Sequence, residues 1–477
     1  MTIKKAILLM IGVVLAFTIV SCGETTEVNG NGEIYVEQEW DVNENTHLVD
    51  APIEINFWSA NSAVDIQGSS MADLVQMFND YQLETYPDSA IKVRPSFQGG
   101  YNNQNSKLQA SLIGNTNPEI AMVGVSSMAL YVDNAVDMRN IFTYEEIENI
   151  FEGFLQFAMY QHKFVAYPYF AATNVNVVNR TLLEQTGLHI PTVDEIIADP
   201  ENSIWTWDYF EEVLTEARKL KTDETDIYGW ATGGIPLYES FYTQGVSIYN
   251  ETATEINFNS DFGLEALTYW QNLAKADLYK NPVLDPNHGT RIQGEFSSGK
   301  VGMLWSTSSI IKSLIQNIYE NPMASGQDPL FELDVLPHPK QSNFYSNQSG
   351  GGLIVFNNKS DERTNAAAEF LRWLQADEQS VYFSTHTGYL VTTKTAVETQ
   401  AWKDFANINP VMDNVIKLMI FNAPDGTRIP IGRAKALADD DFGKYSKGIF
   451  YDDFLRTPAD VLQDCVNRIS YILETNS

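Results

Sequence analysis

The sequence predicts an α/β protein with enough secondary structure for two lobes. From Pro52 onward, short segments with the alternating or continuous apolar patterns of strands follow one another with segments whose apolar residues recur at helical spacing. The chain has 477 residues, of which 44% are hydrophobic and 12% aromatic. It is therefore long enough to bury a sizeable core in two large domains or about three smaller ones. We find no internal repeat, and no low-complexity segment after Asp50.

The first elements after Pro52 form a β-α-β-α-β unit. Ile53–Trp58 alternates as a strand does, and Ile91–Val93 reads as the next strand. Ile120–Val123 is apolar throughout, which is typical of a strand buried on both faces. Between these strands the sequence predicts one helix with the stripe Met71, Leu74, Val75, Phe78 and Tyr81, and a second with Leu108 and Leu112 that ends at Gly114.

Strands and helices continue to alternate beyond Phe164. Further strands are expected at Val175–Val178 and Leu353–Phe356. Thr206 is expected to cap a helix whose core face is Phe210, Val213, Leu214, Ala217 and Leu220. Two more helices are expected over 262–276 and 365–374. Thr457 and Pro458 open the last helix, whose apolar stripe is Val461, Leu462, Cys465, Ile469 and Ile472.

The N-terminus has the form of an export signal. Lys4 and Lys5 precede the apolar stretch Ala6–Val20, so residues 1–21 are expected to be a signal peptide. The sequence then reads Val20-Ser21-Cys22, which resembles the lipobox of bacterial lipoproteins, where a cysteine receives a lipid after cleavage. The alternative is an ordinary exported protein with a cysteine at this position by chance.

Residues 22–50 are expected to be a lipidated cysteine followed by a flexible tether. Glu24–Asp50 is rich in Glu, Asn, Gly and Thr and shows no apolar period, so it cannot build a core. Several acyl chains on Cys22 would hold the protein at the cell surface or in the periplasm. Cys465 would then be the one unmodified cysteine, expected as a small buried hydrophobe.

The charge and the motifs exclude several classes of function. With 30 Lys and Arg against 62 Asp and Glu, the net charge is -32, which repels nucleic acid. Gly294–Lys300 has phosphate-loop spacing, but Val301 stands where a magnesium-binding hydroxyl belongs. The six histidines are too dispersed for a metal site. We therefore expect no metal, no cofactor and no catalytic residue.

Aromatic residues beside turns favour a carbohydrate-like ligand. A ring with a free face can stack on the C–H face of a sugar while its polar edge bonds hydroxyl groups. Packing in the core is the alternative for any single ring. The aromatic residues at expected strand ends or loops are Trp58, Tyr101, Tyr167, Tyr169, Trp205, Trp207, Trp230, Trp305 and Tyr389.

Several segments, in their order along the chain, resemble the extracellular solute-binding proteins of sugar ABC transporters. The resemblance spans about 51–470, and the nearest subgroup is the glycerol-3-phosphate-binding proteins. Besides the lipobox, the segments are Phe57-Trp58, Phe97–Gln104, Gly114–Ala121, Tyr167–Asn174, Trp205–Phe210, Phe296–Met303, Gly350–Gly352, Ala368–Leu374 and Thr387–Leu390. The family implies a periplasmic-binding-protein-like fold with two interleaved lobes joined by hinge strands.

The resemblance also implies where the lobes and partners are. Lobe one is expected at 51–168 and 354–390, and lobe two at 169–353 and 391–477. The lobes would close on the ligand, and the closed form, a monomer, would dock on the ABC transporter permease. Gly350–Gly352 is either part of a hinge or ligand site or a tight turn before a strand.

The ligand residues implied by the resemblance define one interlobe cleft. Tyr101, Gly351 and Tyr389 match residues of the glycerol-3-phosphate subgroup, and its phosphate-binding arginine matches Arg428 or Arg433. A glutamate and a serine of that subgroup are replaced by Val125 and Ala172, and a second serine by Thr307, so a neutral mono- or oligosaccharide is favoured over glycerol phosphate. The expected ligand-binding residues are Trp58, Tyr101, Trp207, Trp230, Thr307, Gly351, Tyr389 and Arg428.

Two other classes share some of these features. A secreted glycoside hydrolase would share the aromatic residues and the anchor, but it would turn a sugar over. A surface adhesin would bind a macromolecule without compaction on ligand binding.

Overall fold

The computed structural model describes residues 26–28, 34–36, 47–160, 163–234, 236–250, 253–280, 288–422, 433–451 and 454–476. The chain divides into two units, Met1–Asp41 and Val42–Ser477. In the first unit, β1 (Thr26–Val28) pairs with β2 (Ile34–Val36) in an antiparallel ladder. Both strands lie within Glu24–Asp50, the segment that the sequence predicts to be a tether.

The second unit is built on one nine-stranded mixed sheet. Its strand order is β10-β9-β11-β8-β13-β5-β3-β4, with β12 paired to β8. The strands are β3 (Ile53–Ser59), β4 (Ile91–Phe97), β5 (Ile120–Gly124), β8 (Tyr167–Asn179), β9 (Tyr228–Thr232), β10 (Tyr279–Lys280), β11 (Val301–Thr307), β12 (Leu333–Leu336) and β13 (Gln348–Val355). A separate hairpin joins β6 (Met159–Tyr160) and β7 (Lys163–Phe164).

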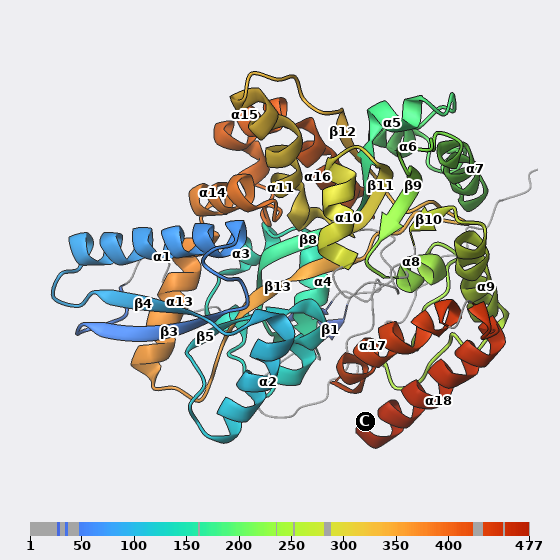
Figure 1. Cartoon of the computed structure of the whole chain (residues 1–477). Coiled ribbons are helices and arrows are strands. Elements are labelled where there is room, and N and C mark those ends of the chain that lie inside the picture. The colour runs from blue at the N-terminus through green and yellow to red at the C-terminus, as the bar shows by residue number, and fades with distance from the viewer. Residues whose placement is uncertain are drawn as a thin grey trace, which may run out of the picture. The chain divides into compact units, whose positions relative to one another are not determined.

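Helices cover both faces of this sheet (Figure 1). Those of the first third are α1 (Ile66–Thr85), α2 (Gly100–Ile113), α3 (Tyr144–Glu148) and α4 (Glu152–Ala158). The middle of the chain forms α5 (Arg180–Glu184), α6 (Val193–Ala198), α7 (Trp207–Arg218), α8 (Leu237–Tyr242), α9 (Asp261–Lys275), α10 (His288–Ser297), α11 (Ile311–Ile315) and α12 (Asn321–Ala324). The last helices are α13 (Asp361–Gln375), α14 (Asp377–Thr387), α15 (Gln400–Ile408), α16 (Pro410–Asn422), α17 (Arg433–Ser446) and α18 (Pro458–Asn476).

Short 3-10 and π turns connect several of these elements. They are η1 (Val125–Tyr131), η2 (Met138–Asn140), η4 (Ser308–Ile310), η5 (Gln316–Glu320), η6 (Ala396–Glu398) and η7 (Lys447–Phe450).

The two faces of β3 pack against different helices. Ile55 and Phe57 join one core cluster with Phe78 of α1 and Phe370 of α13, whose rings meet edge to face at 4.9 Å. Trp58 points to the other face, where it packs against the cluster that holds Leu108 of α2. This alternation follows from the period of two in a strand. It confirms that Ile53–Trp58 is a half-buried strand between helices.

Most element predictions are confirmed. The stripe of α1 is buried at Met71, Leu74, Val75 and Phe78, but Tyr81 is 41% exposed, so this part of the prediction is wrong because the helix turns that residue away from the sheet. Three helix-terminal predictions also hold: Gly114 caps α2, Thr206 accepts from the backbone of Tyr209, and Thr457 accepts from that of Asp460. Cys465 is buried on the apolar face of α18.

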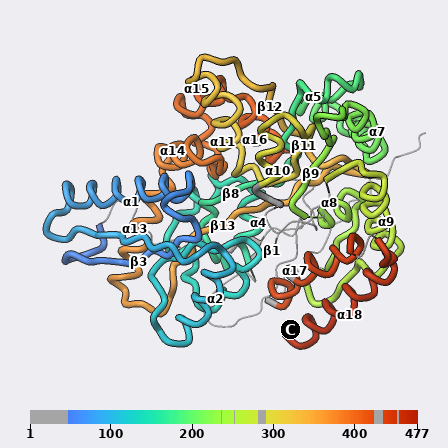
Figure 2. The backbone as a smooth tube through the Cα atoms, in the orientation of Figure 1, coloured from blue at the N-terminus to red at the C-terminus, as the bar shows by residue number. Residues whose placement is uncertain are grey.

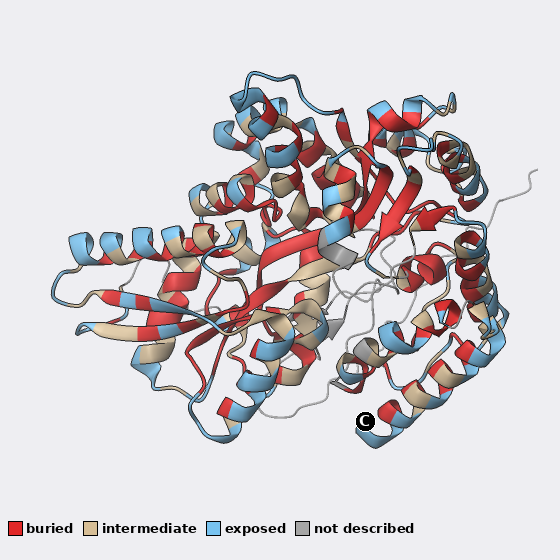
Figure 3. Cartoon of the chain, viewed as in Figure 1, coloured by how far each residue is buried: buried red, intermediate tan, exposed pale blue. Residues whose placement is uncertain are grey.

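The long strands β8 and β13 run through the middle of the sheet (Figure 2). The first part of β8, from Tyr167 to Thr173, pairs with β13. Its second part, from Asn174 to Asn179, pairs with β11 and β12. β8 therefore links two halves of the sheet, and both central strands are largely buried (Figure 3).

Candidate functional site

The change of partner along β8 defines the centre of the candidate site. Thr307 at the end of β11 lies opposite Asn174, while Ser349 and Gly351 of β13 lie opposite Ala172 and Phe170. Opposed residues of an antiparallel pair share a face, and so do every second residues of a strand. Thr307, Asn174, Ser349 and Gly351 therefore form one row along a single face, which we call the hinge row.

Gly351 permits a close approach by Tyr101. A Cβ atom at position 351 would lie 3.2 Å from the Tyr101 hydroxyl and 2.5 Å from the carbonyl oxygen of Val123. Contacts this short are not tolerated by a packed side chain. The first turn of α2 thus brings the Tyr101 hydroxyl directly onto the hinge row.

Tyr389 reaches the same place from the end of α14. Gly388 adopts φ 83° at the C-cap of that helix, and this left-handed turn lets the chain reverse. Leu390, the residue after Tyr389, donates its backbone N–H to the carbonyl of Ala171 at 2.8 Å, which fixes the segment to β8. The ring of Tyr389 stacks on Phe383, with centroids 5.6 Å apart.

The hydroxyl group of Tyr101 is buried next to Tyr389, which is 5% exposed. Burial raises the pKa of Tyr101 well above its usual value, and the neighbouring Tyr389 adds to the rise. Burial also raises the pKa of Tyr389, against the opposite effects of Tyr101 and Asn61. Asn61 follows β3, so three segments of the first 400 residues converge here.

Several buried polar atoms around the hinge row have no hydrogen-bond partner among the described residues. Buried polar groups are normally paired, so such atoms are expected to bond water or a ligand. The atoms are Ser346 Oγ, Asn347 Oδ1, Gln348 Oε1 and Ser349 Oγ, which follow one another along the chain. Ser349 belongs to the hinge row and the other three residues directly precede it, so we take the hinge row as the candidate ligand site.

Glu239 is a buried carboxylate beside this row. It lies on α8 with an exposed fraction of 3%, and Asn174 Nδ2 donates to its Oε1 at 3.0 Å. Burial raises the pKa of Glu239 to about 6, against the lowering effect of the hydrogen bond from Asn174. Sequence analysis did not single out Glu239 or Asn174, and the one available signal for Asn174 was its place at the end of the segment Tyr167–Asn174.

Two of the predicted tryptophans, Trp207 and Trp230, are packed in a core cluster. Trp230 has no exposed surface, and its Nε1 donates to Asn176 at 2.8 Å inside a core cluster. Trp207 is 7% exposed, and its Nε1 donates to the hydroxyl of Thr243 at 3.1 Å. Both rings pack as core residues, and their role in ligand binding stays a prediction. Trp58 is half-buried on β3.

Two predicted site residues fall outside what the structure describes. Arg428 lies in the undescribed segment 423–432, and Cys22 lies in the undescribed segment 1–25. Arg433 is the first residue of α17, but its side chain is not described.

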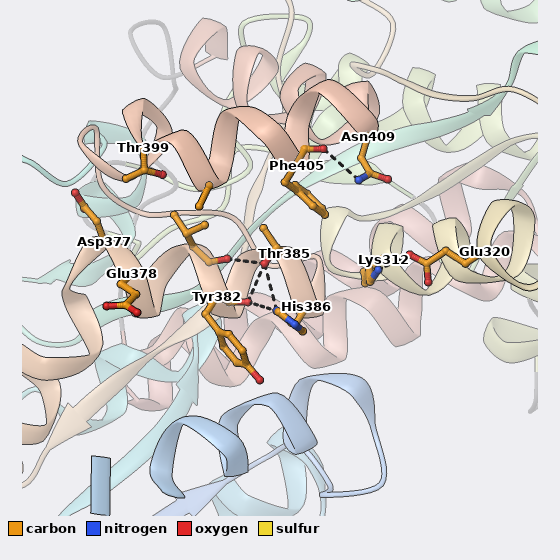
Figure 4. A pocket seen from close by; sticks show the side chains of 12 residues that line it. Lys312, Glu320, Asp377, Glu378, Tyr382, Thr385, His386, Thr399, Phe405 and Asn409 are labelled. Atoms are coloured by element: carbon orange, nitrogen blue, oxygen red, sulfur yellow. Dashed lines mark hydrogen bonds and ion pairs between the residues drawn. The ribbon is translucent and has the colours of Figure 1, made fainter. Parts of the chain in front are cut away.

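A cavity lies between α11, η5, α14 and α15 (Figure 4). Its volume is about 660 Å³. Tyr382 and His386 stack on one wall with their centroids 4.1 Å apart, and Lys312 pairs with Glu320 at 2.6 Å on another. None of the unpartnered atoms of the hinge row lines this cavity, so we assign it no part in the candidate site.

The described residues show neither a metal-binding cluster nor a membrane-spanning helix. Their His, Cys, Asp and Glu side chains do not gather in groups of three suited to a metal ion. No helix in this part of the chain combines the length and hydropathy needed to cross a membrane.

The fold and the site define a class of protein: a mixed α/β fold of the periplasmic-binding-protein type with a polar site where its central strands change partners. The chain belongs to the bacterial extracellular solute-binding protein family, whose model matches residues 65–381. This confirms the family and the fold that the sequence segments indicated. A solute-binding protein of this family acts outside the cytoplasm.

Named relatives agree with this assignment. The sn-glycerol-3-phosphate-binding periplasmic protein UgpB of Rhizobium meliloti is 23% identical over 392 residues, covering 78% of this chain and 83% of that protein. The cyclic alpha-maltosyl-1,6-maltose binding protein from Arthrobacter globiformis has a TM-score of 0.67 at 20% identity, covering 89% of this chain and 100% of that chain. UgpB from Mycobacterium tuberculosis, in complex with glycerophosphocholine, has a TM-score of 0.69 at 17% identity, covering 88% and 98%.

Proposed function

We propose that this protein is the substrate-binding lipoprotein of an ABC importer, which captures a neutral sugar or oligosaccharide at the hinge row and delivers it to a membrane permease. The observation that carries the proposal is the set of buried, unpartnered hydroxyl and amide groups around that row. Such groups match the hydroxyls of a sugar, which both donate and accept hydrogen bonds. Membership of the solute-binding family supports the same role.

The proposed mechanism is closure of two interleaved lobes, 51–168 with 354–390 and 169–353 with 391–477. The packing of the later helices supports this division. Phe370 of α13 packs on Phe78 of α1, whereas Asn414 of α16 donates to Asp334 of β12 at 2.9 Å. Lys417 of α16 also pairs with Asp194 of α6 at 2.9 Å. A ligand bonded to both lobes would favour the closed form, which would then dock on the permease as a monomer.

A melting-temperature screen of the purified protein tests the ligand class. The panel should contain maltose, longer maltosaccharides, monosaccharides and polyols, each with its phosphorylated counterpart where one exists. A saturable rise in melting temperature with an unphosphorylated saccharide is the expected result. Chromatography of the same mixtures should recover the saccharide unchanged, and a product would instead indicate a glycoside hydrolase.

A glycerol-phosphate type ligand is the second candidate. The names of the Rhizobium meliloti relative and of the Mycobacterium tuberculosis structure favour it. A phosphate requires a cationic partner, for which Arg428 and Arg433 are the clustered arginines of the sequence. Calorimetry separates the two candidates, because the affinity for an anion held by arginine falls steeply toward about 0.5 M salt while the affinity for a neutral sugar changes little.

We propose that Cys22 carries the lipid anchor. The apolar run that ends Val20-Ser21-Cys22 supports this assignment. Cys22→Ser should move the protein from the membrane fraction to the soluble exported fraction. Mass spectrometry of the native protein that finds an unmodified Cys22 thiol would refute the anchor.

A further inference from the structure

Glu239 is a carboxylate with no cationic partner among the described residues. Its exposed fraction is 3%, and its hydrogen bonds come from the side-chain amide of Asn174 and from its own backbone N–H. The nearby Asp439 differs in this respect, since Lys435 pairs with it at 2.6 Å and Tyr249 donates to it at 3.0 Å. A buried, unpaired carboxylate is costly to a fold, so its presence calls for a function.

The surroundings of Glu239 connect it to the candidate ligand site. Its partner Asn174 shares the face of the hinge row with Thr307 and Ser349. Burial raises the pKa of Tyr345, and Tyr242 and Glu239 add to the rise. Tyr345 directly precedes the residues whose polar atoms lack partners. Glu239 therefore lies beside the polar groups that we assign to the candidate ligand site.

We propose that Glu239 is a specificity-determining residue of this site, which accepts hydrogen bonds from the hydroxyl groups of a neutral ligand and rejects phosphorylated ligands. This inference rests on the proposed function and deepens it. An ionised carboxylate has acceptor sites only, so it bonds a hydroxyl group well. A phosphate dianion offers mainly acceptor oxygens, so it has no proton to donate to the carboxylate of Glu239. It also carries negative charge, so the carboxylate repels it.

The burial of the Glu239 carboxylate also explains the rejection of phosphorylated ligands. Water and salt screen two like charges less inside a closed site than at the surface, so the repulsion between them is stronger there. A site with a buried acceptor also discriminates strongly against a ligand that cannot donate to it. One residue therefore supplies both the attraction for hydroxyl groups and the repulsion of phosphate.

Calorimetry of wild type and Glu239→Gln tests the proposal. The titrants are the saccharide that gives the largest melting shift in the panel above, and sn-glycerol 3-phosphate. We expect Glu239→Gln to weaken saccharide binding about tenfold or more, because the loss of a charge-assisted acceptor has that size. We expect glycerol 3-phosphate to bind more tightly to Glu239→Gln than to wild type, which should show no measurable heat.

Two further variants control the experiment. Glu212→Gln removes an exposed carboxylate on α7 and should leave both affinities unchanged. Glu239→Asp keeps the charge on a shorter side chain, so it should weaken the saccharide but still reject glycerol 3-phosphate. Circular dichroism of each ligand-free variant establishes that it is folded.

The outcomes separate this inference from the proposed function. If wild type binds a saccharide and Glu239→Gln binds both titrants as wild type does, the role of Glu239 is refuted and the receptor remains a sugar-binding protein. If wild type binds glycerol 3-phosphate tightly and no saccharide, both the neutral ligand class and the role of Glu239 are refuted. If Glu239→Gln does not fold, Glu239→Asp decides, since tight binding of glycerol 3-phosphate by that variant would refute rejection by charge.

Discussion

Replacing Glu239 with Gln should stabilise the ligand-free protein above pH 6 and have almost no effect near pH 4. The carboxyl group is 3% exposed, and Gln keeps its size and an oxygen that can accept from Asn174. What the substitution removes is the cost of ionising a carboxyl group inside the fold. That cost is expressed in the pKa, which burial raises from 4.5 to about 6.

The magnitude follows from this rise in pKa. Each pKa unit corresponds to about 1.4 kcal/mol, so a folded-state pKa of about 6 against 4.5 in the unfolded chain costs about 2 kcal/mol once Glu239 is ionised. An acid whose pKa is raised by folding favours the folded state below pH 4.5, and that contribution is lost as the pH rises through 6. Glu239→Gln should therefore gain about 2 kcal/mol over wild type at pH 7.5.

Denaturant unfolding of both proteins at half-unit steps from pH 4 to pH 8 measures this difference. Titrations common to both proteins cancel, so the difference isolates Glu239. Glu212→Gln provides the control, because an exposed carboxylate should give a difference near zero at every pH. A Glu239→Gln variant that is less stable than wild type at pH 7.5, or a difference that does not change between pH 4 and pH 7, would show that Glu239 is not an uncompensated buried charge.

Three further predictions concern neighbouring positions. Gly351→Ala should lower both stability and ligand affinity, because its Cβ would lie 2.5 Å from the Val123 carbonyl, and wild-type affinity in that variant would refute the close approach. Tyr101→Phe and Tyr389→Phe should each weaken the ligand about fivefold by calorimetry while the fold is kept, and unchanged affinity in both would remove the tyrosines from the site. Burial lowers the pKa of His338 well below its usual value, so His338→Gln should become more stable relative to wild type as the pH falls from 7 to 5. A difference in unfolding free energy that does not change over this range would contradict the prediction.

The sequence identified elements with a strong local signal. Ile53–Trp58 alternates because one face of β3 meets α1 and the other meets α2, and Thr206 was recognisable because a helix cap requires a short polar side chain. By contrast, β13 begins at Gln348, five residues before the predicted strand. Its first residues are polar or glycine, and only pairing with β8 makes them a strand.

The candidate site was only partly visible in the sequence. Tyr101, Gly351 and Tyr389 were found because their segments resemble a known family, and the structure places Tyr101 next to both of the others. Glu239 is one of 62 acidic residues, and nothing local distinguishes a buried carboxylate from an exposed one. Trp230 is fully buried, and the sequence could not show this, because a ring that fills a core and a ring that stacks on a sugar give the same signal in a sequence.

The place of the hinge row links binding to movement. Tyr101 approaches it from the part of the sheet that contains β3, β4 and β5, and Thr307 approaches it from the part that contains β9 and β11. In the proposed mechanism, a ligand that bonds both sides is held fully only while the lobes are closed. Its affinity then depends on the fraction of closed molecules as well as on the contacts themselves. Substitutions that hinder closure, such as Gly351→Ala, should therefore weaken every ligand by a similar factor, whereas substitutions of Glu239 should change the ranking of ligands.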